Sequence, residues 1–149
     1  MAKFDFELDT VLNYRKQSES NKKNQLMNEI NDLNMKKEDL RVIMDSMEEA
    51  KNNFNNKMKD NISILNLQSH YSYLSGLDKA RKSRKKDVDH QSLTVENTRT
   101  ELIDISRSKK VIEILEEKKY EDYKRELNQK EQNENDERNC YNHSRKKTI

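Results

Sequence analysis

Glycine and proline, the residues that turns require, are almost missing from this chain. Its 149 residues include one glycine and no proline, where average usage would supply about ten and about seven. Tight turns and phosphate-cradling loops depend on glycine, and many short connections need proline. The sequence therefore argues against a P-loop, a glycine-rich dinucleotide-binding loop and a many-stranded β-sandwich. It favours long elements joined by few turns.

The amino-acid composition leaves no material for a globular core. Hydrophobic residues make up 31% of the chain and charged residues 39%, against an apolar norm of about 45–50%. The 30 basic and 28 acidic residues nearly cancel, for a net charge of +2, whereas disordered chains have a high net charge. Intermixed opposite charges suit exposed helix faces. We therefore expect long helices whose core is a narrow apolar seam.

Side chains suited to a helix interface recur every three or four residues from Leu8 onward, which is the rhythm of a coiled coil. A short extended lead, residues 1–7, carries Phe4 and Phe6 ahead of them. We predict a first helix over about residues 8–59, widened by Val11, Met27, Val42, Ile43 and Ala50. Its seam positions are Leu8, Leu12, Arg15, Glu19, Lys22, Leu26, Ile30, Leu33, Lys37, Leu40, Met44, Met47, Lys51, Phe54 and Met58.

The strongest turn signal is the segment 60–63, Asp-Asn-Ile-Ser, which follows an asparagine-rich run. Ser63 suits the N-cap of a helix that opens at Ile64. Gly76 is the competing turn position, but Leu74 and Leu77 keep helical spacing around it. A helix tolerates one glycine at a cost of about 1 kcal/mol. We therefore predict a single fold-back at residues 60–63.

The second predicted helix covers about residues 64–138, and a frayed tail follows at 139–149. No hydrophobic residue occurs between Leu127 and Cys140. Positions strictly seven apart in this helix are Leu67, Leu74, Arg81, Val88, Val95, Leu102, Lys109, Glu116 and Tyr123. The seam is completed by Tyr71, Leu77, Ile105, Ile112, Leu115, Lys119 and Leu127.

Two helices joined by a four-residue turn lie antiparallel. The prediction is an all-α, antiparallel two-helix coiled-coil hairpin, forming one elongated domain over residues 1–149. A turn centred near residue 62 places position i opposite roughly position 124 − i, so Lys22 lies opposite Leu102. The second helix then projects past the first from about Lys119 to Arg138. Because helices need a packed face, we expect a binding partner there.

The sequence offers no credible catalytic or metal-binding constellation. His70, His90 and His143 are scattered and lack the spacing of a zinc motif. Cys140 has no neighbouring histidine or helix N-terminus to activate its thiol, and we expect no pocket in a two-helix rod. We expect no enzyme activity, no cofactor and no metal. A single cysteine and the absence of a run of about 20 apolar residues indicate a cytoplasmic protein.

Three further features have more than one interpretation. The basic run 79–86 suits a solvated face, an acidic protein partner or nucleic acid. The segment 70–77 combines core positions with Tyr73, a candidate recognition residue on the stripe Tyr73, Leu77, Ala80 and Arg84. The end formed by residues 8–15 and 120–137 is either a frayed terminus or a contact surface.

Three blocks of residues, taken in order, resemble the FliJ family of the bacterial flagellar type III export apparatus. The first is Phe4-x-Phe6-x-Leu8-x-Thr10-Val11-Leu12-x-x-Arg15. The second is His70-Tyr71-x-Tyr73-Leu74-x-x-Leu77-Asp78-x-Ala80. The third is Glu117-Lys118-Lys119-Tyr120-x-x-Tyr123-x-x-Glu126, followed by Glu131-Gln132-x-x-x-Asp136-Glu137. The resemblance covers nearly the whole chain.

The resemblance implies a coiled-coil hairpin similar to the stalk of the rotary F1-ATPase. Its termini would insert into the ring of the export ATPase FliI, and the stripe of the second helix would contact the export gate protein FlhA. The implied gate contacts are Tyr73, Leu77, Ala80 and Arg84. The implied ring contacts are Leu12, Arg15, Tyr123, Arg125, Glu126, Gln129, Gln132, Asp136 and Glu137. Asn133 and Asn135 depart from the residues that the family often has there.

The resemblance also implies that substrate-specific export chaperones are partners. The protein would be a monomer, peripherally associated with the cytoplasmic face of the inner membrane at the flagellar base. Two other classes stay open on the residues alone. One is a generic structural coiled coil, and the other is a basic hairpin that binds nucleic acid through residues 79–86.

Overall fold

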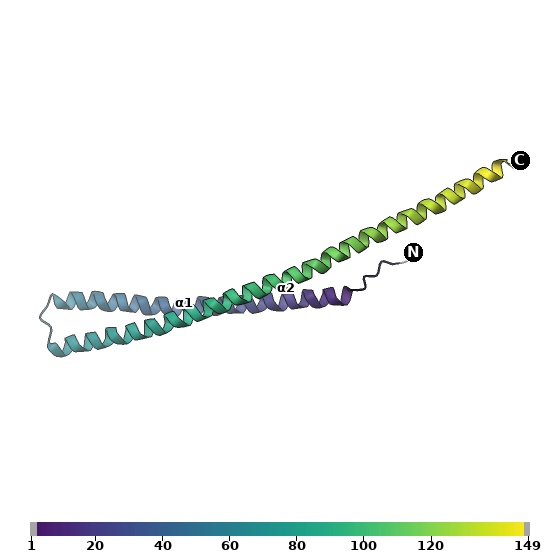
Figure 1. Cartoon of the computed structure of the whole chain (residues 1–149). Coiled ribbons are helices and arrows are strands. Elements are labelled where there is room, and N and C mark those ends of the chain that lie inside the picture. The colour runs from purple at the N-terminus through teal and green to yellow at the C-terminus, as the bar shows by residue number, and fades with distance from the viewer. Residues whose placement is uncertain (1–2, 148–149) are drawn as a thin grey trace. The chain divides into compact units, whose positions relative to one another are not determined.

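The computed structural model describes residues 3–147, which form two helices joined by a short turn (Figure 1). Helix α1 spans Asp9–Met58 and helix α2 spans Ile64–Lys147. Among the described residues no strand is present. Both helices begin within one residue of the predicted positions, and the all-α two-helix hairpin is confirmed.

The chain divides into two compact units, each built from parts of both helices. The first, here called the turn unit, runs from Ser20 to Ile103. The second, the terminal unit, combines the chain up to Glu19 with the chain from Asp104 onward.

Contacts within the turn unit show that its helical segments run antiparallel. The rings of Phe54 and His70 are 5.7 Å apart, and the Lys22 ammonium lies 2.6 Å from the Glu101 carboxylate. The α1 residue with the lower number therefore faces the α2 residue with the higher number, as antiparallel helices require. The predicted register placed Leu102 opposite Lys22, one residue from the observed partner.

Ser63 caps the N-terminus of α2, as its position predicted. Its hydroxyl oxygen accepts a hydrogen bond from the amide of Asn66 at 3.3 Å, which satisfies one of the free amides of the first helical turn. The carbonyl of Ser63 accepts the amide of Leu67 at 3.1 Å. The fold-back therefore lies where the sequence placed it.

Gly76 lies inside α2 and forms no turn. Its φ is not positive, and a Cβ atom built on it would meet nothing within 4 Å. The helix therefore passes through Gly76 without needing glycine for its backbone conformation or for close packing.

The heptad pattern of α2 is confirmed: every seventh position from Leu67 to Tyr123 is buried or half-buried. Three of the other seam predictions are wrong. Tyr71 is 62% exposed, because the seam steps from Leu67 to His70. Leu115 and Lys119 are also exposed, because Glu116 occupies the seam at that level.

After Leu33 the predicted seam of α1 is right at Leu40, Met47 and Phe54, which are half-buried, but wrong at the three positions between them. Lys37, Met44 and Lys51 are exposed, and the residues facing α2 there include Lys36, Ile43 and Ala50. This phase brings Ile43 and Ala50 inward in place of Met44 and a lysine, which buries apolar area without burying a second ammonium group. The end positions Leu8 and Met58 are exposed too.

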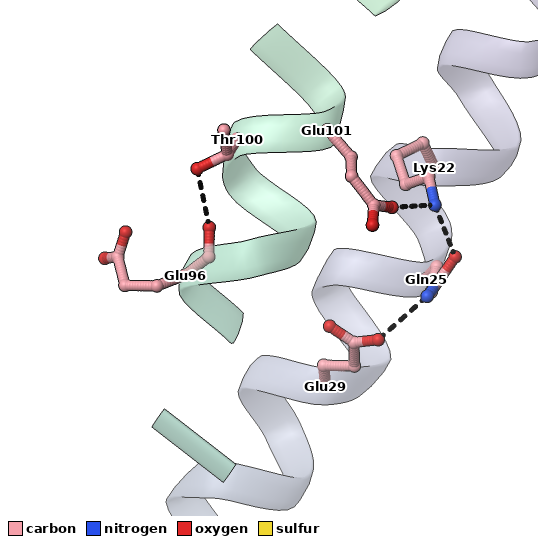
Figure 2. A network of polar contacts seen from close by, with 6 residues as sticks. All are labelled: Lys22, Gln25, Glu29, Glu96, Thr100 and Glu101. Atoms are coloured by element: carbon pink, nitrogen blue, oxygen red, sulfur yellow. Dashed lines mark hydrogen bonds and ion pairs between the residues drawn. The ribbon is translucent and has the colours of Figure 1, made fainter. Parts of the chain in front are cut away.

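Polar side chains occupy several interface positions of the turn unit. Gln91 is buried; its amide nitrogen donates to the Glu29 carbonyl at 3.0 Å, and its oxygen accepts from the Lys36 ammonium at 3.2 Å. Figure 2 shows a neighbouring network, in which Lys22 bonds both Glu101 and Gln25. Such specific bonds favour one register over its alternatives.

Replacing Gly76 by alanine should stabilise the protein. The space for a Cβ is open, and alanine in a helix is favoured over glycine by about 0.5–1 kcal/mol. Thermal unfolding of Gly76→Ala followed by circular dichroism measures the change, with Ser75→Ala as the neighbouring control. A lower melting temperature for Gly76→Ala would contradict the open surroundings of Gly76.

Removing the hydroxyl cap should destabilise the start of α2. Ser63→Ala loses the bond to the Asn66 amide and should lower the free energy of unfolding by about 1 kcal/mol. Ser63→Asp retains a capping oxygen and serves as the matched control in chemical denaturation. Equal stability of Ser63→Ala and the wild type would show that the cap contributes nothing.

Candidate functional site

The chain ahead of α1 packs against α2 within the terminal unit. Residues 3–6, which we call the lead, have no regular structure, and a turn at residues 7–8 connects them to the helix. The Asp9 amide donates to the Phe6 carbonyl at 2.9 Å. Phe6 is buried and Leu12 is only 1% exposed. The lead is therefore fixed by a backbone hydrogen bond to the start of α1 and by burial of the Phe6 side chain.

An aromatic cluster of Phe4, Tyr120 and Tyr123 joins the lead to α2. The ring centre of Phe4 lies 5.2 Å from that of Tyr120 and 5.5 Å from that of Tyr123. The Lys124 ammonium lies 4.6 Å from the centre of the Tyr120 ring, which is within range of a cation–π interaction. These contacts extend the packed part of α2 past the start of α1.

The predicted projection of α2 therefore begins later than expected. We expected residues from Lys119 onward to lack an internal partner, but Phe4 contacts Tyr120 and Tyr123. Leu127 is still half-buried, and every residue from 128 to 147 is exposed. The difference arises because the lead, though not helical, continues along α2.

The far end of α2 is helical beyond the predicted limit. We expected a frayed tail at residues 139–149, yet the helix continues to Lys147; residues 148 and 149 lie outside the described range. Arg145, Lys146 and Lys147 occupy the last turn, where positive charge stabilises the helix dipole.

One ion pair crosses the helix interface of the terminal unit. The Lys109 ammonium lies 2.9 Å from the Glu19 carboxylate, whose side chain is 9% exposed. The hydrogen bond to Glu19, with further attraction from Glu113, raises the pKa of Lys109 above its ordinary value of 10.5. Both charges occupy seam positions, so the pair stabilises the interface only as long as Lys109 remains protonated.

The residues implied as ring contacts fall into two groups in the structure. Leu12 is buried, and Arg15 and Tyr123 are half-buried where α2 packs against the chain's beginning. The remaining members are exposed: Arg125, Glu126, Gln129, Gln132, Asp136 and Glu137. At 3.6 residues per turn, Arg125, Gln129, Gln132 and Asp136 share a face about 60° wide.

The residues implied as gate contacts lie along α2 in the turn unit. Tyr73 is 55% exposed, Leu77 and Ala80 are half-buried, and Arg84 is exposed. Their spacing places all four on one helix face. Next to this stripe, hydrogen bonds from Arg81 and then Lys82 lower the pKa of the Asp78 carboxyl.

Four of the six cations in the basic run 79–86 lie close to carboxylates of their own helix. Arg81 and Lys82 lie 3.0 and 3.1 Å from the Asp78 carboxylate. Lys85 lies 3.2 Å from Asp89, and Arg84 lies 4.0 Å from Asp87. Paired cations release fewer counterions on binding phosphates, so these contacts weaken the nucleic-acid interpretation.

Within residues 3–147, no group of three or more His, Cys, Asp or Glu side chains is placed to hold a metal ion. Cys140 is exposed. Neither described helix contains a stretch long and apolar enough to cross a lipid bilayer.

Sequence reasoning missed two contributors to the terminal unit. Phe4 was expected only in an extended lead, and Tyr120 was not given a contact of its own. The available signal was a pair of tyrosines three residues apart, which share one helix face, together with two phenylalanines near the start of the chain.

Loss of the Lys109 charge should destabilise the helix interface. Because its folded pKa is raised, the pair contributes fully below about pH 10.5 and is lost as the pH rises through the folded value. Lys109→Met should therefore lower the melting temperature at pH 7, and the difference from wild type should shrink above pH 10.5. Lys110→Met, at the neighbouring exposed lysine, is the control. A deficit that persists at high pH would contradict the electrostatic origin.

Comparison with known proteins identifies the family. The family model described as "Flagellar FliJ protein" matches residues 4–148. The search of curated proteins and the search of solved structures each gave no match. The match covers almost the entire chain and agrees with the three sequence blocks noted above. The chain therefore belongs to the flagellar FliJ protein family, whose members are components of the flagellar protein export apparatus.

Proposed function

We propose that this chain is a non-enzymatic subunit that inserts into the ring of the export ATPase FliI and promotes its assembly. The supporting observation is the end of α2, where every residue from 128 to 147 is exposed. A helix of this length without a packed face is marginal in water. Its stability and purpose are explained if a partner covers it.

The chemistry of this end suits a contact that forms and releases readily. It has no apolar stripe between Leu127 and Cys140, and its charges have both signs. Many polar contacts at an exposed surface are individually weak and are screened by salt. The face of Arg125, Gln129, Gln132 and Asp136 is the part that we assign to the ring.

Leu12 and Arg15 have a supporting role in this proposal. Leu12 has almost no exposed surface, so it acts by holding α1 against α2 rather than by touching the ring. Tyr123 belongs with them, because its ring packs against Phe4.

The second part of the proposal is a contact between the turn unit and the export gate protein FlhA. Tyr73 and Arg84 offer exposed surface on the same face as Leu77 and Ala80. Export chaperones are further partners. Through them the protein would be held at the flagellar base, at the cytoplasmic face of the inner membrane.

Removing the exposed end should abolish stimulation of the ATPase. A chain ending at Leu127 keeps Tyr120 and Tyr123, which pack against the lead, and every described residue that it loses, 128 to 147, is exposed. We expect no increase in FliI turnover or ring formation with this variant, while the full chain stimulates both and does so less at high salt. Unchanged stimulation would reject the ring contact.

Two full-length variants distinguish a role of one helix face from a general requirement for the helix end. Alanine at Gln129, Gln132 and Asp136 should weaken stimulation, whereas alanine at Lys130, Glu134 and Arg138, on the opposite face, should not. Alanine favours the helix in both sets. Equal losses of ATPase stimulation in the two variants would show that the face has no special role.

The alternative function, a generic structural coiled coil, is tested by sedimentation of the wild-type chain. A stable dimer would favour that alternative.

A further inference from the structure

A cavity of about 490 Å³ lies within the terminal unit, between the beginning of the chain and α2. Its apolar walls come from Phe4, Phe6 and Leu8 on one side and from Leu115 and Tyr123 on the other. Cavities that hold small groups start at about 300 Å³. The space is large enough for a long side chain and has aromatic walls.

The rim of this cavity is negatively charged. Asp5, Glu7, Asp122 and Glu126 line it, against two lysines, Lys3 and Lys119. Arg125 already neutralises Asp122 at 2.7 Å. The carboxylates of Asp5, Glu7 and Glu126 take part in none of the ion pairs found among residues 3–147. The rim therefore has a small excess of negative charge, which favours a cation over the phosphate groups of lipids or nucleic acids.

The aromatic walls favour one kind of cation. The aromatic rings of Phe4, Phe6 and Tyr123 line the cavity, and the face of an aromatic ring attracts a cation. A guanidinium group is planar and weakly hydrated; it stacks on aromatic rings and pairs with carboxylates through two parallel hydrogen bonds. The aromatic walls offer the rings for stacking, and the acidic rim offers the carboxylates for these hydrogen bonds.

We propose that this cavity binds an arginine side chain presented by the partner protein. The inference rests on the proposed function in one respect, since it places that arginine on the surface of the export ATPase ring. It differs from the contact assigned to the exposed end of α2, because here a single side chain enters a walled site.

Binding of arginine itself can be tested without the ATPase. The full-length chain is titrated with the peptide amide acetyl-Leu-Arg-Leu and with its twin, in which neutral citrulline replaces arginine. Aromatic NMR signals of Phe4, Tyr120 and Tyr123 should shift with the arginine peptide and respond far less to citrulline. Equal shifts, or none with either peptide, would overturn the proposal.

The acidic rim and the aromatic wall are tested by substitution in the full chain. Asp5→Asn combined with Glu126→Gln should weaken arginine-peptide binding and ATPase binding by roughly tenfold each. Phe4→Leu, which keeps an apolar side chain but loses the ring, should weaken both by roughly threefold. Glu131→Gln combined with Glu134→Gln, at exposed positions outside the cavity, is the matched control.

The outcomes separate this inference from the proposed function. If the wild-type chain fails to bind the ATPase, the proposed function is wrong, and the peptide comparison alone decides whether the cavity takes arginine. If the wild type binds and the rim variants bind equally well, the inference is overturned while the proposed function stands. Equal melting temperatures of variants and control exclude a folding defect as the cause of weaker binding.

Discussion

The packing of α1 against α2 along a narrow seam is the interaction on which this protein depends. The buried apolar side chains are few: Phe6, Leu12, Ala50, Val88 and Val95. A core this thin cannot select a register by hydrophobic burial alone, because a slip of one heptad would bury a similar area. Polar groups at seam positions supply the selection. Gln91 bonds across to Glu29 and Lys36 in the turn unit, and Lys109 pairs with Glu19 in the terminal unit.

The position of the turn determines which part of α2 stays exposed. The fold-back before Ser63 gives α1 far fewer residues than α2, 50 against 84. The lead reduces this difference because Phe4 packs against Tyr120 and Tyr123 of α2. What remains is an exposed helix end adjoining a walled, acidic cavity. We have proposed a different kind of partner contact for each of these two features.

Features decided by local chemistry could be predicted from the sequence, and features decided by the opposite helix could not. The cap that Ser63 provides for α2 and the passage of α2 through Gly76 depend on neighbours in sequence. The heptad repeat from Leu67 to Tyr123 does so too. Three seam positions of α1 after Leu33 were missed because adjacent pairs such as Lys36 and Lys37 fit the spacing equally well. Gln91 on the other helix decides between them.

In the terminal unit, too, contacts with a distant part of the chain could not be predicted from the sequence. The ring contacts of Phe4 with Tyr120 and Tyr123 join residues more than a hundred positions apart, and an irregular segment has no periodicity to reveal its partner. The proposed ring contacts were reached through family resemblance, whereas the burial of Leu12 and the exposure of Arg125, Gln129, Gln132 and Asp136 followed only from the structure. The cavity beside them has no sequence signature, because it is formed where a non-helical lead passes over a helix.

A cross-linking experiment tests the antiparallel register most directly. In a Cys140→Ser background, cysteines replace Lys36 and Gln91, whose side chains are 3.2 Å apart, or Lys36 and Thr98, one heptad further along α2. With a short bismaleimide reagent at low protein concentration, the first pair should form an intramolecular cross-link efficiently and the second should not. Preferential linking of Lys36→Cys to Thr98→Cys, or cross-links found only between separate chains, would contradict the hairpin described here.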